Sequence, residues 1–188
     1  MTRFALLALL AAVPFLQGCV GLAVTGAAAG AMIATDRRTT GTYVEDESIE
    51  WKAVGRIREK FPTAHANPTS YNRRVLLTGE APTEEGKKQI EEAVRAIENV
   101  KEVTNELQVA GASSMASRGN DSLVTSNVKA RMVNNGKFSP SHVKVVTEAS
   151  AVYLMGIVSH AEGDAAVEIA RNTSGVVRVV KVFEYVEK

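Results

Sequence analysis

A seven-residue segment that occurs twice constrains the fold of this chain more than any other feature. The first copy, Val75 to Ala81, reads VLLTGEA, and the second, Val152 to Val158, reads VYLMGIV. Their glycines, Gly79 and Gly156, lie 77 positions apart. Short aliphatic runs of this kind are typical of buried strands, and a glycine at the end of one indicates a bend or a close approach of another backbone segment. We therefore expect two copies of one small unit.

The same order of predicted elements surrounds both copies: helix, strand, strand, helix, strand. Val-rich segments at 100–109 and 176–186 close the two units. A hairpin pairs its strands antiparallel, whereas a strand-helix-strand crossover pairs them parallel. The predicted class is α+β, with a small mixed three-stranded sheet covered by two helices in each unit. Each unit has room for only a modest core, so we expect the two to pack together.

The N-terminus has the pattern of a targeting segment. Arg3 precedes an apolar run of 13 residues, Phe4 to Leu16, which is shorter than the ~20 residues needed to span a bilayer and typical of a signal peptide. The next residues complete the sequence Leu16-Gln17-Gly18-Cys19, which resembles the lipobox of bacterial lipoproteins. This resemblance implies cleavage before Cys19, the only cysteine, and acylation of its thiol. Val20, rather than an aspartate, follows it, which implies sorting to the outer membrane.

These boundaries divide the chain into five predicted parts. They are a signal peptide at 1–18, a lipidated Ala/Gly-rich tether at 19–45, a first domain at 46–109, a linker at 110–120 and a second domain at 121–188. The first helix of the first domain is expected to start near Asp46, with Asp46 or Ser48 as its cap. An alternative is that residues 4–33 form one long membrane helix.

The composition argues against several function classes. A net charge of +1 disfavours a dedicated nucleic-acid binder. The three histidines, His65, His142 and His160, do not have zinc-ligand spacing and do not neighbour the cysteine. The sequence also contains no nucleophile elbow and no Gly-rich phosphate loop. We therefore expect no enzyme activity, no metal and no cofactor.

The order of elements, the two repeated strands and the Val-rich closing strands resemble the BON domain family. Two such units behind a lipobox cover nearly the whole chain. The resemblance implies a lipid-anchored protein on the periplasmic face of the outer membrane. It also implies that the protein binds anionic phospholipid, phosphatidylglycerol in particular, and supports envelope integrity and division-site localisation. Two alternatives remain: a periplasmic protein-binding scaffold for outer-membrane assembly or cell-wall enzymes, and a purely structural stress lipoprotein.

The predicted lipid contact lies on the helix that is expected to start near Asp121. Successive helix residues turn by about 100°, so Val124, Val128 and Met132 form one stripe that faces the core. The residues that point away from this stripe include three apolar side chains, a serine and a lysine: Leu123, Ser126, Lys129, Ala130 and Val133. Exposed apolar residues beside a lysine suit an anionic lipid interface. The resemblance points to the same helix, although family members can carry an aromatic residue where this chain has Leu123.

Two further expectations concern packing. The exposed apolar patch on this helix has an alternative explanation, in which it packs against the first domain. The glycines Gly79 and Gly156 are expected to be structural, because a Cβ there would collide with the covering helix.

Overall fold

The computed structural model describes residues 36–187, and from Arg37 onward they form one compact unit. The predicted signal peptide, Cys19 and most of the predicted tether lie outside the described residues. None of the described helices has both the length and the apolar character that crossing a bilayer requires.

The first domain pairs a hairpin with a parallel closing segment. Its elements, in chain order, are α2 (Thr40–Lys60), β1 (His65–Tyr71), β2 (Arg74–Ala81), α3 (Glu84–Arg95), β3 (Glu102–Asn105) and β4 (Gln108–Val109). β1 pairs antiparallel with β2, while β3 and β4 pair parallel with it. As predicted from Asn67 and Pro68, β1 is an edge strand.

The second domain repeats this plan. Its elements are α4 (Met115–Val133), the 3-10 turn η1 (Pro140–His142), β5 (Val143–Glu148), β6 (Ala151–Val158), α5 (His160–Arg171) and β7 (Arg178–Tyr185). β5 and β7 flank β6, antiparallel and parallel respectively. The predicted capping box at the start of α5 is present, with Ser159 and Glu162 bonding each other's backbone N–H groups. The predicted α+β class and the repeated αββαβ order are confirmed.

The closing strand of the first domain differs from the prediction of one strand at 100–109. It is interrupted after Asn105, so the first sheet has four strands instead of three. The side-chain amide of Asn105 donates to the carbonyl of Lys87 and to the carboxylate of Glu91 on α3, and its oxygen accepts from the backbone N–H of Leu107. This local bonding turns the chain away from regular strand geometry for two residues.

Both first helices begin earlier than predicted. Thr39 caps α2 by accepting the N–H of Thr42, and Ser114 caps α4 by accepting the N–H of Ser117. The predicted helix starts near Asp46 and Asp121 are therefore wrong, and the two helices extend back through residues 40–45 and 115–120, which the sequence analysis placed in the tether and the linker. Most residues of these first turns are exposed. The half-buried ones are Thr42, Tyr43 and Glu45 in α2, and Ser117 and Arg118 in α4. These turns have no apolar stripe facing a sheet, so hydrophobic periodicity does not detect them.

Asp46 and Asp121 lie inside these helices and are buried; neither is a cap. Each carboxylate accepts the backbone N–H groups of the hairpin turn in its own domain. Asp121 accepts from Ala149 at 2.9 Å and Ser150 at 2.8 Å, and both turn residues have positive φ. The equivalent bonds of Asp46 run from Asn72 and Arg73, whose φ values are also positive. Because such turns strain non-glycine residues, the aspartates stabilise the conformation that closes each hairpin.

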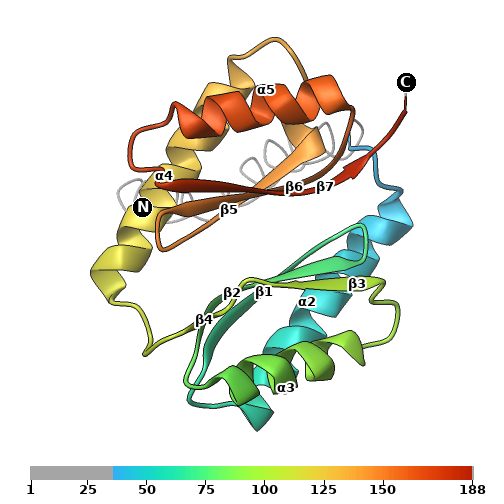
Figure 1. Cartoon of the computed structure of the whole chain (residues 1–188). Coiled ribbons are helices and arrows are strands. Elements are labelled where there is room, and N and C mark those ends of the chain that lie inside the picture. Colours follow the sequence, from blue (N-terminus) through green and yellow to red (C-terminus); the bar gives the residue numbers. More distant parts are fainter. Residues whose placement is uncertain (1–35, 188) are drawn as a thin grey trace, which may run out of the picture. The chain divides into compact units, whose positions relative to one another are not determined.

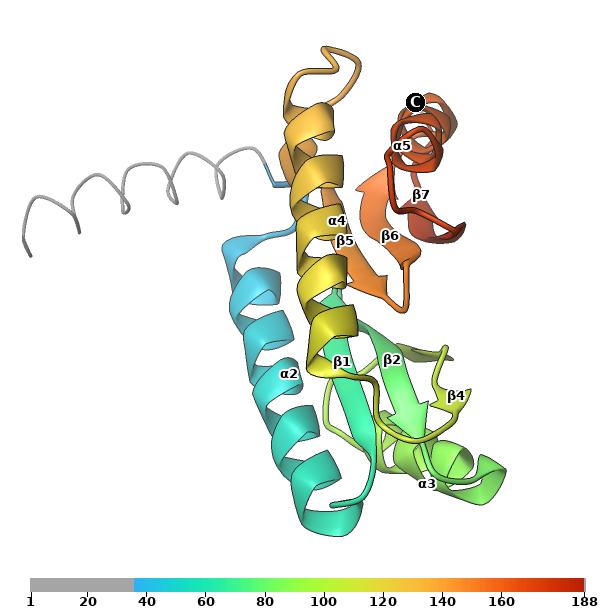
Figure 2. The ribbon, with the colours of Figure 1, turned by 90° about the vertical axis from the view of Figure 1, so that its left-hand side faces the viewer.

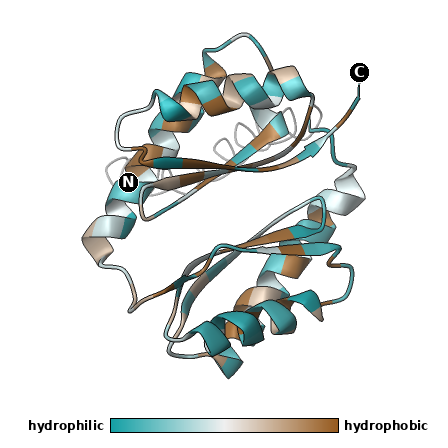
Figure 3. Cartoon of the chain, viewed as in Figure 1, coloured by the Kyte–Doolittle hydropathy of each residue, from teal (hydrophilic) through white to brown (hydrophobic). Residues whose placement is uncertain are grey.

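Each domain has a core between its helices and the outer face of its sheet. The predicted stripe of α4, Val124, Val128 and Met132, is buried in the second core. A third cluster lies between the two sheets and joins the domains, as expected; it contains Tyr71, Leu76, Ala151, Tyr153 and Met155. The compact unit therefore has four layers in the order helices, sheet, sheet, helices (Figure 1). Long segments of the strands are apolar, as the hydropathy colouring shows (Figure 3).

The two repeated glycines are packing positions, but the predicted neighbour is wrong. A Cβ on Gly79 would lie less than 3.0 Å from the backbone carbonyl of His65, and one on Gly156 equally close to that of His142. The collision is with the backbone beside the neighbouring strand of the hairpin, not with the covering helix. Gly79 also has a φ of +103°, which only glycine adopts readily.

Candidate lipid-binding surface

Helix α4 has one face in the core and one face in solvent. Its buried residues, Asp121, Val124, Val128 and Met132, recur every three or four positions and pack toward the sheet. α4 lies on the same side of the compact unit as α2, opposite α3 and α5 (Figure 2). Its outward face is therefore presented by a rigid element that the core holds in place.

The residues predicted to point outward all do so. The lipid-contact set is exposed throughout: Leu123, Ser126, Lys129, Ala130 and Val133. The two larger side chains keep most of their surface in water, with relative exposures of 66% for Leu123 and 65% for Val133. They remain exposed although the first domain is present, so the alternative in which this patch packs on that domain is wrong. The domains meet through the inner faces of their sheets instead.

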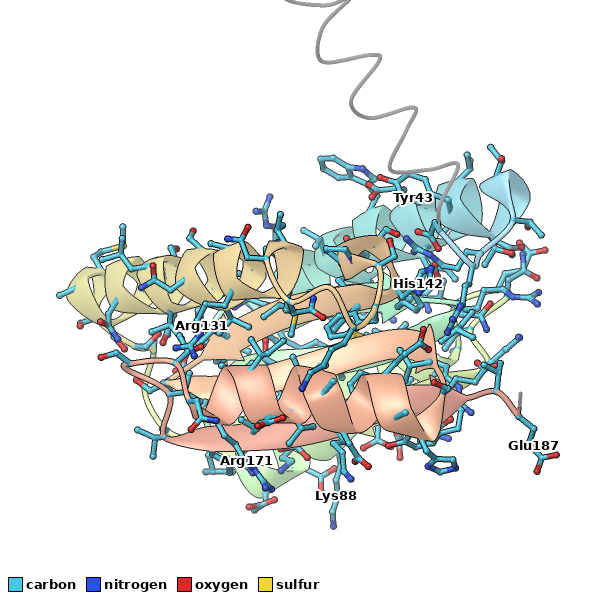
Figure 4. All side chains as sticks on the ribbon, turned by 90° about the horizontal axis from the view of Figure 1, so that it is seen from above. Tyr43, Lys88, Arg131, His142, Arg171 and Glu187 are labelled. Carbon is cyan, nitrogen blue, oxygen red and sulfur yellow. The ribbon has the colours of Figure 1, made fainter. Side chains whose placement is uncertain are left out.

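The charges on α4 favour an anionic partner. Its basic residues are Arg118, Lys129 and Arg131, of which the last two are exposed. Its single acidic residue, Asp121, is buried and bonded to the hairpin turn. Arg131 lies between α4 and α5 and donates to the carbonyl of Asn172 (Figure 4). The solvent face of α4 thus carries apolar side chains among small polar ones, with a basic border.

The serines on this face are less polar than their side chains suggest. The hydroxyl of Ser126 donates to the carbonyl of Ser122 at 2.9 Å, and that of Ser122 donates to the carbonyl of Arg118 at 3.0 Å. Such bonds to the preceding turn satisfy the hydroxyl hydrogen locally. Ser126 therefore has no spare hydrogen for a lipid headgroup, and its contribution is small size between apolar neighbours.

A second exposed apolar pair lies on α2 and was not predicted. Val44 and Trp51 are 61% and 74% exposed, and their spacing of seven places them on one face of the helix. Glu47, one turn before the tryptophan, is exposed as well. The position of Trp51, off the stripe formed by Ile49 and Ala53, was the available signal in the sequence. Because this face carries the exposed acid Glu47 as well as the exposed base Arg58, it lacks the uniformly basic charge of the α4 face.

Comparison with known proteins identifies the family. The BON domain pattern matches residues 46–111 and again residues 120–187. The chain is 41% identical over 182 residues, 95% of its length and 94% of the relative's, to the outer membrane lipoprotein DolP of Haemophilus influenzae. It is 34% identical to a 21 kDa hemolysin of Actinobacillus pleuropneumoniae, covering 81% of this chain and 80% of that one. The osmotically inducible protein Y of Escherichia coli is 28% identical, over 81% of this chain and 78% of its own.

Proposed function

This chain belongs to the BON domain family as a two-domain outer-membrane lipoprotein, and from that premise we propose that it binds anionic phospholipid through the exposed face of α4. Two features of α4 together carry the proposal. Its side chains Leu123 and Val133 lie in solvent, and all of its exposed charged residues are basic. We propose phosphatidylglycerol as the ligand in the membrane, and envelope integrity with division-site localisation as the processes served.

Anchoring and surface contact have separate roles in this proposal. Cys19 carries the acyl chains, and two or more chains give stable attachment where one is reversible. The α4 face then sets which lipids lie beneath the domain. Each basic residue near an anionic surface contributes ~1 kcal/mol, and each aliphatic side chain that leaves water roughly 1.5–3 kcal/mol. Lys129 supplies one electrostatic contribution of this kind, and Leu123 supplies one hydrophobic contribution.

Vesicle flotation of residues 37–188, which lack the acyl anchor, tests the lipid surface. We expect this chain to float with phosphatidylglycerol vesicles and not with phosphatidylcholine vesicles. Leu123→Glu combined with Val133→Glu should abolish flotation while the circular dichroism spectrum stays unchanged, since both side chains are exposed. Lys129→Gln should weaken binding and reduce its dependence on salt.

A matched control places the same two charges elsewhere. Val109 and Val177 are also exposed, at 45% and 84%, and lie outside α4. The variant with glutamate at both positions should float like the unchanged chain. Flotation of the doubly charged α4 variant would contradict the proposal, and failure of the unchanged chain to bind any anionic vesicle would favour the protein-binding scaffold instead.

A further inference from the structure

Three side chains with metal-binding atoms meet where the two domains join. His65 on β1 and Glu80 on β2 are directly opposite each other in the hairpin register, and Glu148 ends β5 of the second domain. One ligand atom from each, an imidazole nitrogen or a carboxylate oxygen, lies within 4.8 Å of the other two. The imidazole Nδ1 of His65 lies 2.8 Å from Glu80 Oε2. The cluster thus combines two strands of one sheet with one strand of the other.

The alternation of strand residues directs all three side chains toward the space between the sheets. Glu80 lies on the same face of β2 as Leu76, and Glu148 pairs in register with Ala151; both Leu76 and Ala151 belong to the inter-sheet cluster. The amide of Asn67 donates to Glu148 Oε2 at 3.0 Å across the domain boundary. The cluster therefore forms one end of the interface that joins the domains.

The burial of the two carboxylates makes their charge significant. Glu80 and Glu148 are only 7% and 8% exposed. Glu80 accepts the backbone N–H of Ser113 at 3.2 Å, and the imidazole of His65 lies beside it, but no lysine or arginine side chain pairs with either carboxylate among the described residues. Two carboxylates that share a poorly solvated site repel each other unless a cation or a proton intervenes. Arg118 lines the pocket beside the cluster, but its guanidinium donates to the carbonyl and hydroxyl of Ser113.

An independent observation at the same place is a buried hydroxyl. Thr78 is 1% exposed, and its Oγ1 has no hydrogen-bond partner among the described residues. It lies two residues before Glu80, so it points from the same face of β2, and it pairs in register with Asn67, whose amide reaches Glu148. A buried hydroxyl without a partner is costly, which favours a polar ligand on this face of β2, beside the carboxylates.

We propose that His65, Glu80 and Glu148 bind one divalent transition-metal ion, with zinc as the ion best suited to this ligand set. Imidazole nitrogen and carboxylate oxygen are both zinc ligands, three protein ligands leave the fourth tetrahedral position to water, and the imidazole favours zinc over calcium or magnesium. The ion would neutralise the two buried carboxylates and link the first domain to the second. The sequence expectation of no metal rested on local histidine spacing, whereas these ligands are 15 and 68 positions apart along the chain.

Zinc titration of the mature full-length protein in detergent, after removal of metals with a chelator, tests the site. We expect one equivalent of Zn²⁺ to bind and to raise the melting temperature by roughly 5 °C or more, because the ion binds only the folded arrangement. His65→Gln and Glu148→Gln should each weaken zinc binding at least about tenfold and remove the shift. Each glutamine keeps a hydrogen-bonding side chain of similar size, which favours folding.

His160→Gln is the matched control, because that histidine is exposed on α5 and outside the cluster. It should bind zinc like the unchanged protein. A second measurement uses Co²⁺, whose visible absorption reports its ligands: the spectrum of the unchanged protein should be lost in His65→Gln. Absence of stoichiometric zinc binding in the unchanged protein would overturn the proposal. Equal affinity of the unchanged, His65→Gln and Glu148→Gln proteins would overturn it as well.

Discussion

Arg37 holds Glu162 through two parallel hydrogen bonds, each 2.8 Å long. The same guanidinium donates to the carbonyl of Ile157 at 2.8 Å. Glu162 also accepts the backbone N–H of Ser159 and so completes the capping box of α5. The beginning of the compact unit is thereby fixed to the second domain, the domain that carries the proposed lipid surface.

This pairing predicts a loss of stability in acid. The bonds from Arg37, aided by those from Ser159, lower the pKa of Glu162 from 4.5 to about 2, although burial opposes the shift. Because the folded-state pKa is below the unfolded value, the stabilisation is fully present above about pH 4.5 and is lost as pH falls toward 2. The interactions of this carboxylate with Arg37 and Ser159 together, net of its burial, account for up to about 3 kcal/mol. Urea unfolding of residues 37–188 at pH 6 and pH 3 measures this difference.

Glu162→Gln should lower the free energy of unfolding at pH 6. In this variant the free energy of unfolding should also change less between pH 4.5 and pH 2 than in the unchanged chain. Glu168→Gln, on the same helix, is the control: this exposed residue pairs with Lys137 at 3.5 Å, and such surface pairs contribute at most about 1 kcal/mol. The explanation is wrong if both variants unfold with the same pH dependence as the unchanged chain.

The features that sequence reasoning predicted correctly are local or periodic. The stripe Val124, Val128 and Met132 follows from helix geometry, and the outward positions of Leu123 and Val133 follow from the same angles. These residues obey the 3.6-residue period whatever the tertiary structure is. The repeated order of elements could also be predicted from the sequence, because the strands, helices and turns of each unit have distinct patterns of apolar and turn-forming residues.

The features that were missed depend on contacts between distant segments. Nothing in the helix sequence shows that the carboxylate of Asp121 reaches the turn at Ala149, 28 positions later. The cluster of His65 and Glu148 requires the two sheets to face each other, and no periodicity encodes that. Hydrogen bonds between distant segments of one domain, and side-chain clusters formed between the two domains, therefore needed the structure.

The repeated glycines give a stability prediction with a built-in contrast. Gly79→Ala should destabilise the protein by ~2–4 kcal/mol, because its Cβ would overlap a backbone carbonyl and its φ of +103° strains any other residue. Gly156→Ala meets the same kind of overlap without positive φ, so we expect a smaller loss of ~1–3 kcal/mol. Thermal and urea unfolding measure both.

Gly55 provides the control, because a Cβ there meets nothing within 4 Å and the residue lies inside α2. Gly55→Ala should stabilise the protein by roughly 0.5–1 kcal/mol through helix propensity. Unchanged melting of the Gly79 and Gly156 variants would show that these glycines are not packing requirements and would reopen a ligand-binding role for them.

The single tryptophan distinguishes which helix touches the membrane. Trp51 is 74% exposed on α2, with the exposed acid Glu47 one turn away, whereas the exposed charges of α4 are basic. We therefore expect the emission of Trp51 to stay at the same wavelength when phosphatidylglycerol vesicles are added to residues 37–188. Moving the probe to α4, as Leu123→Trp in a Trp51→Phe background, should give emission that shifts to shorter wavelength on the same vesicles, because an interfacial indole leaves water. The reverse pattern, with a shift for Trp51 and none for Leu123→Trp, would place the lipid contact on α2 and remove it from α4.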